Sequence, residues 1–288
     1  LVGAVTGVGA IDAIATYAIP VMGGGNGAGI TPMSKMWAAA TGGDASTWYA
    51  SAFAIISIGN LCAVFMSALL NKLGQAKPSL TGNGRLMEGE EKLENKANEV
   101  KPTVGDYATG LALGVVCYNV ANLYAKKVSI INHANLGFTI HTFAFMVILI
   151  AILNVSNILP ENVKAGARGM QMFFVKYMSF PLMITVGIGT NLSDYAKVFT
   201  NPAYILIIMA TVIGAMIGTF LMGKLFHFYP VESMLTAGLC MANGGGSGDV
   251  QCLGAAHRME LMSYAQISSR IGGAIMLVIA SFVFGKFL

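Results

Sequence analysis

The sequence is poor in charged residues. Asp, Glu, Lys and Arg make up only 10% of its 288 residues, whereas an average soluble domain contains about 25%. Hydrophobic residues make up 55%, and the mean hydropathy is +0.67. So few charges cannot cover the surface of a soluble protein of this length, so the composition predicts an integral membrane protein of the all-α class. The net charge of +4 comes without a basic run, which argues against a nucleic-acid partner.

Cysteines and catalytic groups are also scarce. The four cysteines, Cys62, Cys117, Cys240 and Cys252, lie far apart in apolar segments and form no CxxC pair. This spacing indicates packing roles and gives no sign of a metal cage or a disulfide framework. The apolar segments contain neither paired carboxylates nor a His/Cys cluster. The pattern therefore predicts a protein that is no enzyme and holds no resident cofactor.

Several apolar windows are long enough to cross a bilayer, which takes about 20 residues. They lie at 48–71, 105–125, 136–159, 172–192, 202–226 and 263–287. A shorter apolar window at 2–19 leads into a glycine-rich loop. The sequence starts at Leu1 inside this apolar stretch, without an initiator Met, and we expect further N-terminal helices to precede it.

A polar segment of mixed charge at 73–104 interrupts the apolar windows. It cannot lie in lipid, so it predicts a cytoplasmic loop that is partly helical over 86–98. Lys164, Arg168, Lys224 and Arg258 then also fall inside, which fits the positive-inside rule, although Lys126 and Lys127 fall outside and count against it. This loop divides the chain into the end of a first repeat, 1–72, and a second repeat, 105–288.

Two similar glycine loops, GGGNGAG at 23–29 and GGGSGDV at 244–250, lie between apolar flanks. In the predicted order of spans they enter the membrane from opposite faces, and their flanks are too short to cross it. Each loop therefore predicts the tip of a re-entrant hairpin, the second at about 231–262, with His257 and Arg258 at its cytoplasmic interface. Glycine permits tight turns, and such backbone is tolerated at membrane depth only inside protein or beside a watery cavity.

The similarity extends beyond the glycines. YASAFAIISIGN follows the first loop and YAQISSRIGG the second, which places Ser57 opposite Arg270. Two such halves of opposite orientation form an inverted repeat, the architecture of many secondary transporters, with the substrate bound where the broken helices meet. The alternative is that these glycines only let helices pack closely. A nucleotide-binding loop is disfavoured because no strand precedes GGGNGAG and no Lys-Ser/Thr follows it.

Arg270 lies about seven residues into an otherwise apolar span. At the centre of a membrane helix an arginine costs ~2.5–3.5 kcal/mol on the insertion scale. One explanation is that the side chain reaches back to the inner interface. The other is ligand binding, because a guanidinium fork matches a carboxylate in bidentate fashion. Arg270 therefore predicts an anionic ligand that carries a carboxylate.

Polar side chains at the loop tips suit the same ligand. Asn26, Asn243 and Ser247 can donate hydrogen bonds to carboxylate or hydroxyl oxygens. Helix N-termini at the tips would add positive dipole ends, and freed backbone carbonyls can hold a small cation. Asp249 is a candidate cation or proton site, or a cap of the helix that follows.

Taken together, IPVMGGGNGAG, AGLCMANGGGSGD and SYAQISSRIGG resemble the 2-hydroxycarboxylate transporter family over the whole chain. The resemblance implies an elevator-like secondary transporter of malate, lactate or citrate in the bacterial cytoplasmic membrane, with Na⁺ or H⁺ as coupling ion. It also implies a homodimer, in which a static domain forms the dimer contact and a mobile domain carries both hairpins.

The resemblance further implies roles for individual residues. Arg270 would bind the substrate carboxylate, Asn26 and Gly27 would line the site from the first hairpin, and Asn243 and Ser247 would line it from the second. In sodium-coupled members, cations bind around the second loop, which here implies Asn243 and Ser269.

The chain departs from the family pattern at Gly244. In citrate-transporting members an arginine follows the Asn of the second loop, as NRGGSG, whereas this chain has Asn243-Gly244. Citrate has three carboxylates, malate two and lactate one, so a site with one guanidinium fewer is expected to favour malate and lactate over citrate. The departure also leaves sodium coupling, proton coupling and simple exchange open.

Two other functions remain open at this point. One is a membrane subunit of a sodium-pumping decarboxylase, which would need a catalytic acid or base, or a cofactor partner. The other is a carrier of glutamate or another organic anion. Uptake by the purified protein alone separates a carrier from an enzyme subunit, because the subunit would need its partners.

Overall fold

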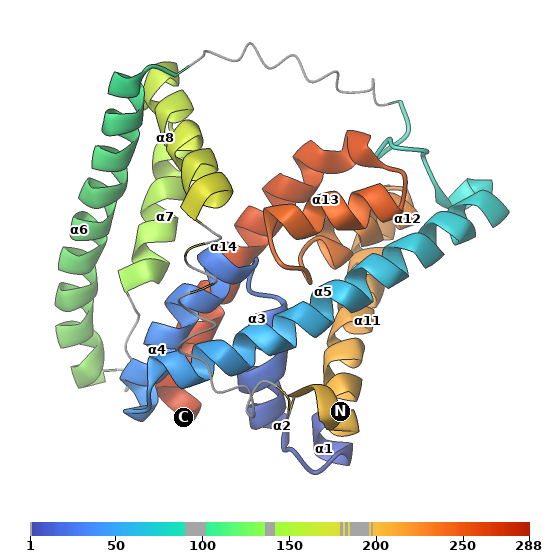
Figure 1. The fold of residues 1–288 in the computed structure, drawn as a ribbon, viewed down its shortest axis with the longest axis horizontal. Helices are drawn as coiled ribbons and strands as arrows, with labels where there is room; N and C mark the ends of the chain where they lie inside the picture. Colours follow the sequence, from blue (N-terminus) through green and yellow to red (C-terminus); the bar gives the residue numbers. More distant parts are fainter. Residues whose placement is uncertain are drawn as a thin grey trace. The chain divides into compact units, whose positions relative to one another are not determined.

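A computed structural model describes residues 2–89, 102–135, 142–178 and 198–288, together with 181, 184 and 196. The chain forms two compact units, one of Leu1–Glu94 with Asn191–Leu288 and one of Asn95–Thr190. In the described part of both units the regular structure is helical, apart from an isolated bridge between Met87 and Phe228 (Figure 1). The predicted all-α class is confirmed.

The unit of residues 95–190 is built around one long helix. Its described elements are α6 (Val104–Asn135), α7 (Thr142–Val155), α8 (Glu161–Phe173) and the π-helical turn η4 (Phe174–Met178). Helix α6 packs along both α7 and α8. A Cβ added at Gly166 would lie 1.8 Å from the carbonyl oxygen of Asp106, so α8 and α6 touch backbone to backbone. Small residues are a common means of such close packing between membrane helices.

Within the described residues, four helices are long and apolar enough to cross a membrane. They are Ala45–Ala76, Val104–Lys127, Pro202–Leu225 and Met259–Phe287. These helices confirm the windows predicted at 48–71, 105–125, 202–226 and 263–287. Of the other two windows, 136–159 begins outside the described residues and most of 172–192 lies outside them, as does most of the helix expected over 86–98.

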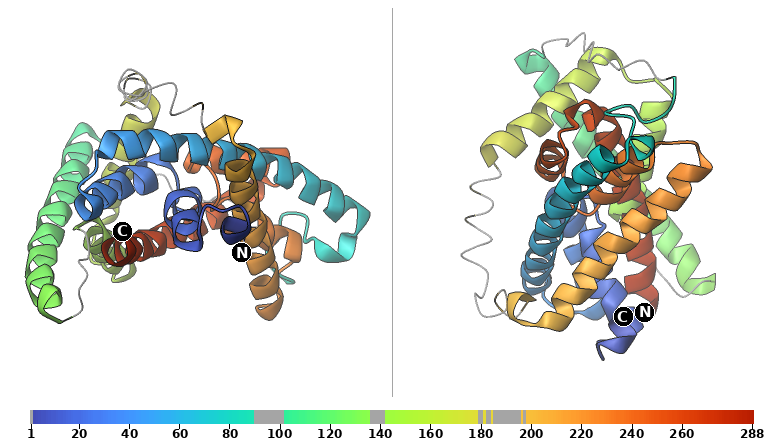
Figure 2. Two further views of the ribbon diagram at one scale, coloured as in Figure 1. Left: turned by 90° about the horizontal axis from the view of Figure 1, so that it is seen from below. Right: turned by 90° about the vertical axis from the view of Figure 1, so that its right-hand side faces the viewer.

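The spans of the first unit begin at residues suited to helix starts. Helix α5 (Ala45–Ala76) follows Asp44, whose carboxylate accepts hydrogen bonds from the backbone N–H groups of Ser46 and Thr47. Hydrogen bonds from the Ser46 and Thr47 hydroxyls, together with these backbone bonds, lower the pKa of the exposed Asp44 to about 2. Helix α11 (Pro202–Leu225) has Pro202 in its first turn and Asn201 as its cap. In Figure 2 the gold ribbon of α11 crosses the blue-to-cyan ribbon of α5, against which it packs.

The first glycine loop joins two helical arms, as predicted. After α1 (Val2–Val5), the incoming arm runs through α2 (Ala10–Asp12), η1 (Ala13–Ala18) and α3 (Ile19–Val21). The outgoing arm runs through η2 (Asn26–Ile30) and α4 (Thr31–Thr41), and ends at Gly42 with a φ of 72°. Helix α5 follows directly, and a 3₁₀ turn, η3 (Pro78–Leu80), comes after it.

The second glycine loop also joins two arms. The incoming arm is α12 (Pro230–Ser233) with η5 (Met234–Leu239), and the outgoing arm is α13 (Gly246–Ala255). The short turn η6 (Met259–Leu261) then leads into α14 (Met262–Phe287). Both incoming arms contain a π-helical segment, η1 and η5.

The core of the first unit encloses these arms. Val21 from the first hairpin and Leu235 and Leu239 from the second are fully buried, in one apolar cluster with Ile208 and Val212 of α11. The irregular backbone of η5 is thereby covered by protein. Such cover is the condition under which irregular backbone is tolerated in a membrane protein.

Candidate functional site

The two glycine loops, from opposite ends of the chain, lie against each other. A Cβ added at Gly25 would lie 2.6 Å from the Cα of Gly245 and 2.9 Å from the carbonyl oxygen of Gly244. Real Cβ atoms do not approach other atoms so closely, so only glycine fits at Gly25. Backbone contact between the loops thus explains why glycine is required here in particular.

Each loop ends at a glycine that starts the outgoing helix. Gly25 has a φ of 102° and Gly245 a φ of 98°, values that favour glycine. The Gly25 carbonyl accepts from Gly29 N at 3.0 Å, and the Gly245 carbonyl accepts from Asp249 N at 2.9 Å. The two helix N-termini therefore start at the junction of the loops, where their free N–H groups and positive dipole ends favour an anion.

The span that follows each hairpin contacts the loop of the other hairpin. In α5, Asn60 Oδ1 accepts from Gly244 N at 3.2 Å, and Asn60 Nδ2 donates to Gln251 Oε1 at 2.8 Å. In α14, a Cβ added at Gly273 would lie 3.3 Å from the Cα of Gly24. The sequence analysis did not single out Asn60 or Gln251. The available signal was that Asn60 is a polar residue in an apolar span and ends the stretch that matches the second half.

Arg270 lies on the turn of α14 that touches the first loop. A Cβ added at Gly24 would lie 3.2 Å from the carbonyl oxygen of Ser269 and 3.0 Å from the Cα of Gly273. The Arg270 side chain is exposed, and among the described residues no side chain or carbonyl forms a hydrogen bond or ion pair with it. Arg270 is therefore a cation beside the junction that can accept an anionic partner.

The predicted residues of the first loop are partly accessible. Asn26 is half-buried, and its Oδ1 accepts from the Tyr49 hydroxyl at 2.6 Å. Gly27 is exposed, with no atom within 4 Å of an added Cβ. Tyr49 was not predicted as a site residue, although it begins the stretch that matches the second half.

The predicted residues of the second loop differ in their exposure. Ser247 is exposed and Gly244 is half-buried. Asn243, by contrast, is fully buried: its Nδ2 donates to Asp249 Oδ1 at 2.9 Å and its Oδ1 accepts from Gly245 N at 2.8 Å. Asn243 therefore shapes the loop from inside. Asp249, in the first turn of α13, is only 1% exposed.

Ser269, the other residue expected near a cation, is 8% exposed, and its hydroxyl donates to the Gln266 carbonyl at 3.3 Å. Across the described residues, no three His, Cys, Asp or Glu side chains form a metal-binding group. Any cation at this junction would thus depend on neutral oxygens and on Asp249.

The base of the second hairpin holds a buried ion pair that the sequence analysis missed. Glu232 is fully buried, and its Oε1 lies 3.6 Å from Arg258 Nε and accepts from the Thr81 hydroxyl at 2.5 Å. Arg258 Nη2 donates to Asn83 Oδ1 at 3.1 Å. Arg258 lies at the end of the hairpin, and its buried side chain connects both ends of the hairpin to the turn after α5, whereas His257 is exposed. The place of both residues at the membrane interface stays a prediction.

The sequence is similar to those of known membrane transporters. The model of the 2-hydroxycarboxylate transporter family matches residues 1–282. The citrate/sodium symporter of Klebsiella pneumoniae is 42% identical over 274 residues, which are 94% of this chain and 60% of that protein. The Na(+)-malate symporter of Bacillus subtilis (strain 168) is 34% identical over 95% of this chain and 59% of its own length. The citrate transporter CitP of Lactococcus lactis subsp. lactis is 30% identical over 97% of this chain and 61% of its own length.

The chain thus spans about 60% of the length of these curated relatives. Their bacterial origin and the four apolar spans indicate a multi-pass protein of the inner membrane. The resemblance seen in the glycine loops is confirmed over nearly the whole sequence, and the chain belongs to the 2-hydroxycarboxylate transporter family.

Proposed function

We propose that this chain forms the binding site of a secondary transporter that moves 2-hydroxycarboxylate anions across the inner membrane with a coupling ion. The observation that carries the proposal is the junction of the two glycine loops, where two helix N-termini start beside the turn of α14 that carries the exposed Arg270. A carboxylate is the ligand that this combination favours. Transport requires binding and release without bond chemistry, so the mechanism needs no catalytic acid or base.

In this proposal Arg270 binds one carboxylate of the substrate in bidentate fashion. Asn26 and Gly27 line the site from the first loop, and Gly244 and Ser247 line it from the second. Exposed Gly27 leaves room for a ligand next to the backbone, because nothing lies within 4 Å of an added Cβ. The N–H groups at the starts of η2 and α13 then bind the remaining carboxylate and hydroxyl oxygens.

The coupling ion binds behind the second loop. Asn243, buried Asp249 and the Ser269 hydroxyl supply oxygen atoms of the kind that hold Na⁺, and a protonated Asp249 would serve proton coupling. Relatives exist with either ion, since similar proteins include the Na(+)-malate symporter and the citrate/malate-proton symporter of Bacillus subtilis (strain 168). The ion is carried together with the substrate and is not a resident cofactor.

Movement follows from two re-entrant hairpins related by an inverted repeat. Three features support this repeat: the matching arms, the two glycine caps and the reciprocal contacts between each span and the opposite loop. Both hairpins belong to the unit of Leu1–Glu94 with Asn191–Leu288. The boundaries of the two compact units differ from those of the proposed repeats 1–72 and 105–288. Because one unit contains both hairpins, we propose that this unit makes the elevator-like movement and that the homodimer forms elsewhere in the protein.

The substrate preference is proposed to depend on Gly244. With no guanidinium at this position, the site is expected to favour malate and lactate over citrate, although the relative with 42% identity is a citrate/sodium symporter. The position can accept a side chain, because an added Cβ would meet only Asn60 atoms at 3.9 Å. Gly244→Arg is therefore a substitution that tests the preference without a steric conflict at its Cβ.

The test uses the full-length protein, purified and reconstituted in liposomes loaded with lactate. Uptake of labelled malate and citrate is measured with and without a sodium gradient, for the wild type, Arg270→Ala, Arg270→Lys and Gly244→Arg. Loss of charge-assisted hydrogen bonds worth ~1.5–3 kcal/mol predicts about a 10- to 150-fold weaker affinity in Arg270→Ala. Arg270→Lys keeps the charge but not the fork, so it should recover only part of the affinity. Gly244→Arg should raise citrate uptake relative to malate.

Strong citrate uptake by the wild type that Gly244→Arg does not increase would contradict the role of Gly244 but not the transport function. Uptake of neither anion by the purified protein would contradict the main proposal. It would favour a carrier of another organic anion, such as glutamate, or a membrane subunit of a sodium-pumping decarboxylase that needs its partners.

A further inference from the structure

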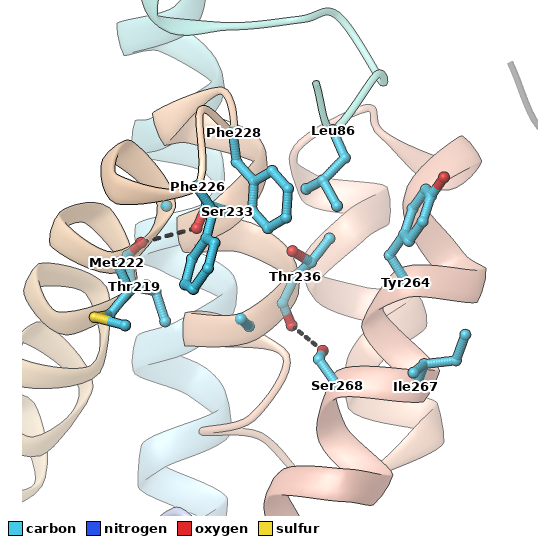
Figure 3. A pocket seen from close by; sticks show the side chains of 12 residues that line it. Leu86, Thr219, Met222, Phe226, Phe228, Ser233, Thr236, Tyr264, Ile267 and Ser268 are labelled. Atoms are coloured by element: carbon cyan, nitrogen blue, oxygen red, sulfur yellow. Dashed lines mark hydrogen bonds between the residues drawn. The ribbon is translucent and has the colours of Figure 1, made fainter. Parts of the chain in front are cut away.

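A cavity of about 280 Å³ lies in the first unit, beside the incoming arm of the second hairpin. Figure 3 shows its lining residues, which come from the end of α11, this arm and the start of α14, with Leu86 at its edge. We propose that this cavity binds one acyl chain of a membrane phospholipid.

The cavity is a poor site for the transported anion, because the hydroxyls of Ser233, Thr236 and Ser268 already donate hydrogen bonds within the protein. Its hydroxyls donate to backbone carbonyls within the protein: Ser233 to Thr219 and Thr236 to Glu232, each at 2.8 Å, and Ser268 to Thr236 at 2.9 Å. None of the 12 lining residues is charged. A carboxylate placed here would lose its hydration without gaining a partner, which is strongly unfavourable.

Its walls suit a hydrocarbon chain. Apart from the hydroxyl-bearing residues, the lining consists of small residues and large apolar ones such as Met222, Phe226, Phe228 and Ile267. Water is poorly held in such a space, because each molecule needs two to four polar partners. An empty cavity would lack contacts on one side of every lining group, and an acyl chain restores those contacts.

The mouth of the cavity opens onto an exposed apolar surface. Met222, Phe226 and Ile267 line it and are nevertheless 53%, 58% and 57% exposed. They belong to or adjoin the ends of the membrane spans α11 and α14, which also expose Leu221 and Ile271. A chain can thus enter sideways from the bilayer. Inside, it would lie against Thr236 and Ala237 of η5 and support the incoming arm of the hairpin.

Tryptophan fluorescence in vesicles of acyl-chain-brominated phosphatidylcholine tests this proposal. The two native tryptophans are first replaced, as Trp37→Phe and Trp48→Phe. Phe228→Trp then serves as the cavity probe, and Leu221→Trp, on the exposed face of α11, serves as the control for ordinary lipid contact. Brominated chains should quench both probes, whereas acrylamide in the water should quench Phe228→Trp weakly.

Filling the cavity separates a bound chain from general lipid contact. Adding Ala237→Leu should reduce the quenching of the Phe228→Trp probe at least twofold and leave the Leu221→Trp probe unchanged. Quenching of Phe228→Trp that Ala237→Leu does not alter would overturn the proposal. The proposal would also be overturned if acrylamide quenched the Phe228→Trp probe and brominated chains did not. This second comparison does not use Ala237→Leu, so it remains valid even if that variant fails to fold.

Discussion

The two hairpins reach a similar shape by different means. The first is held by close backbone packing: Gly24 lies against Gly273, Gly25 against Gly245, and Gly29 against the Gly23 carbonyl. The second is held by buried polar side chains, with Asn243 bonded to Asp249 at its tip and Glu232 paired with Arg258 at its base. A helix–loop–helix element can thus be fixed either by the absence of side chains or by satisfied polar groups.

This difference determines which kind of substitution each hairpin tolerates. Backbone contact leaves no volume to spare, so the first hairpin should be sensitive to a single added methyl group. Buried polar groups are costly when a partner is lost, so the second should be sensitive to the removal of a charge or a hydrogen bond.

The largest effect is expected from Glu232→Gln, which removes a charge at almost constant volume. It leaves Arg258 buried without its counter-charge, and breaking a buried ion pair in this way costs ~3–5 kcal/mol. Thermal unfolding of the purified protein should show a Tm lower by on the order of 10 °C. Glu260→Gln, at an exposed glutamate nearby, is the matched control and should change the Tm little. An equal Tm in both variants would show that the pair does not stabilise the hairpin.

The next largest effect is expected from Gly25→Ala, which adds volume without changing charge. A φ of 102° and a Cβ 2.6 Å from the Cα of Gly245 predict a cost of ~2–5 kcal/mol. Substrate uptake in liposomes should be lost.

Gly245→Ala separates backbone strain from steric contact between the loops. Gly245 has a φ of 98°, so the strain is similar, but its added Cβ would lie 3.5 Å from the Cα of Gly25, which is an ordinary contact. It should lose less activity than Gly25→Ala, while Gly254→Ala, in open space on α13, should keep wild-type uptake. If Gly245→Ala and Gly25→Ala lose the same activity, backbone strain alone is responsible and the contact between the loops is not.

Much of this arrangement was predictable from sequence because it depends on local signals. Apolar windows predict the spans, and glycine runs between apolar flanks predict the hairpin tips. The exact helix starts were not predictable in this way: matching the three glycines of each loop in order would pair Gly25 with Gly246, whereas the residues that cap the outgoing helices are Gly25 and Gly245. The helix start depends on a positive φ, and three consecutive glycines do not reveal which of them adopts it.

Long-range polar contacts were the part that sequence could not supply. Glu232, Arg258 and Thr81 lie in three separate segments, and no spacing rule connects them. Arg258 near the end of an apolar segment is typical of an interface residue, and only the fold shows that a carboxylate lies beside it. Asn60, by contrast, could have been predicted as a contact residue, because a polar side chain in an apolar span is expected to have a hydrogen-bonding partner.

Asn60 joins the two hairpins, and its removal should have the smallest of the three effects. Asn60→Ala deprives Gly244 N of its acceptor and Gln251 of its donor. Because a hydrogen bond of this kind contributes ~0.5–1.5 kcal/mol, uptake should fall about 2- to 15-fold, mainly through weaker substrate affinity. Gln251→Ala removes only the side-chain partner and keeps the bond to the loop, so it should lose less than Asn60→Ala. A larger loss of uptake in Gln251→Ala than in Asn60→Ala would mean that the main role of Asn60 is to hold α13. The second loop would then keep its shape without its contact to α5, because the internal Asn243–Asp249 bond would be enough to fix it.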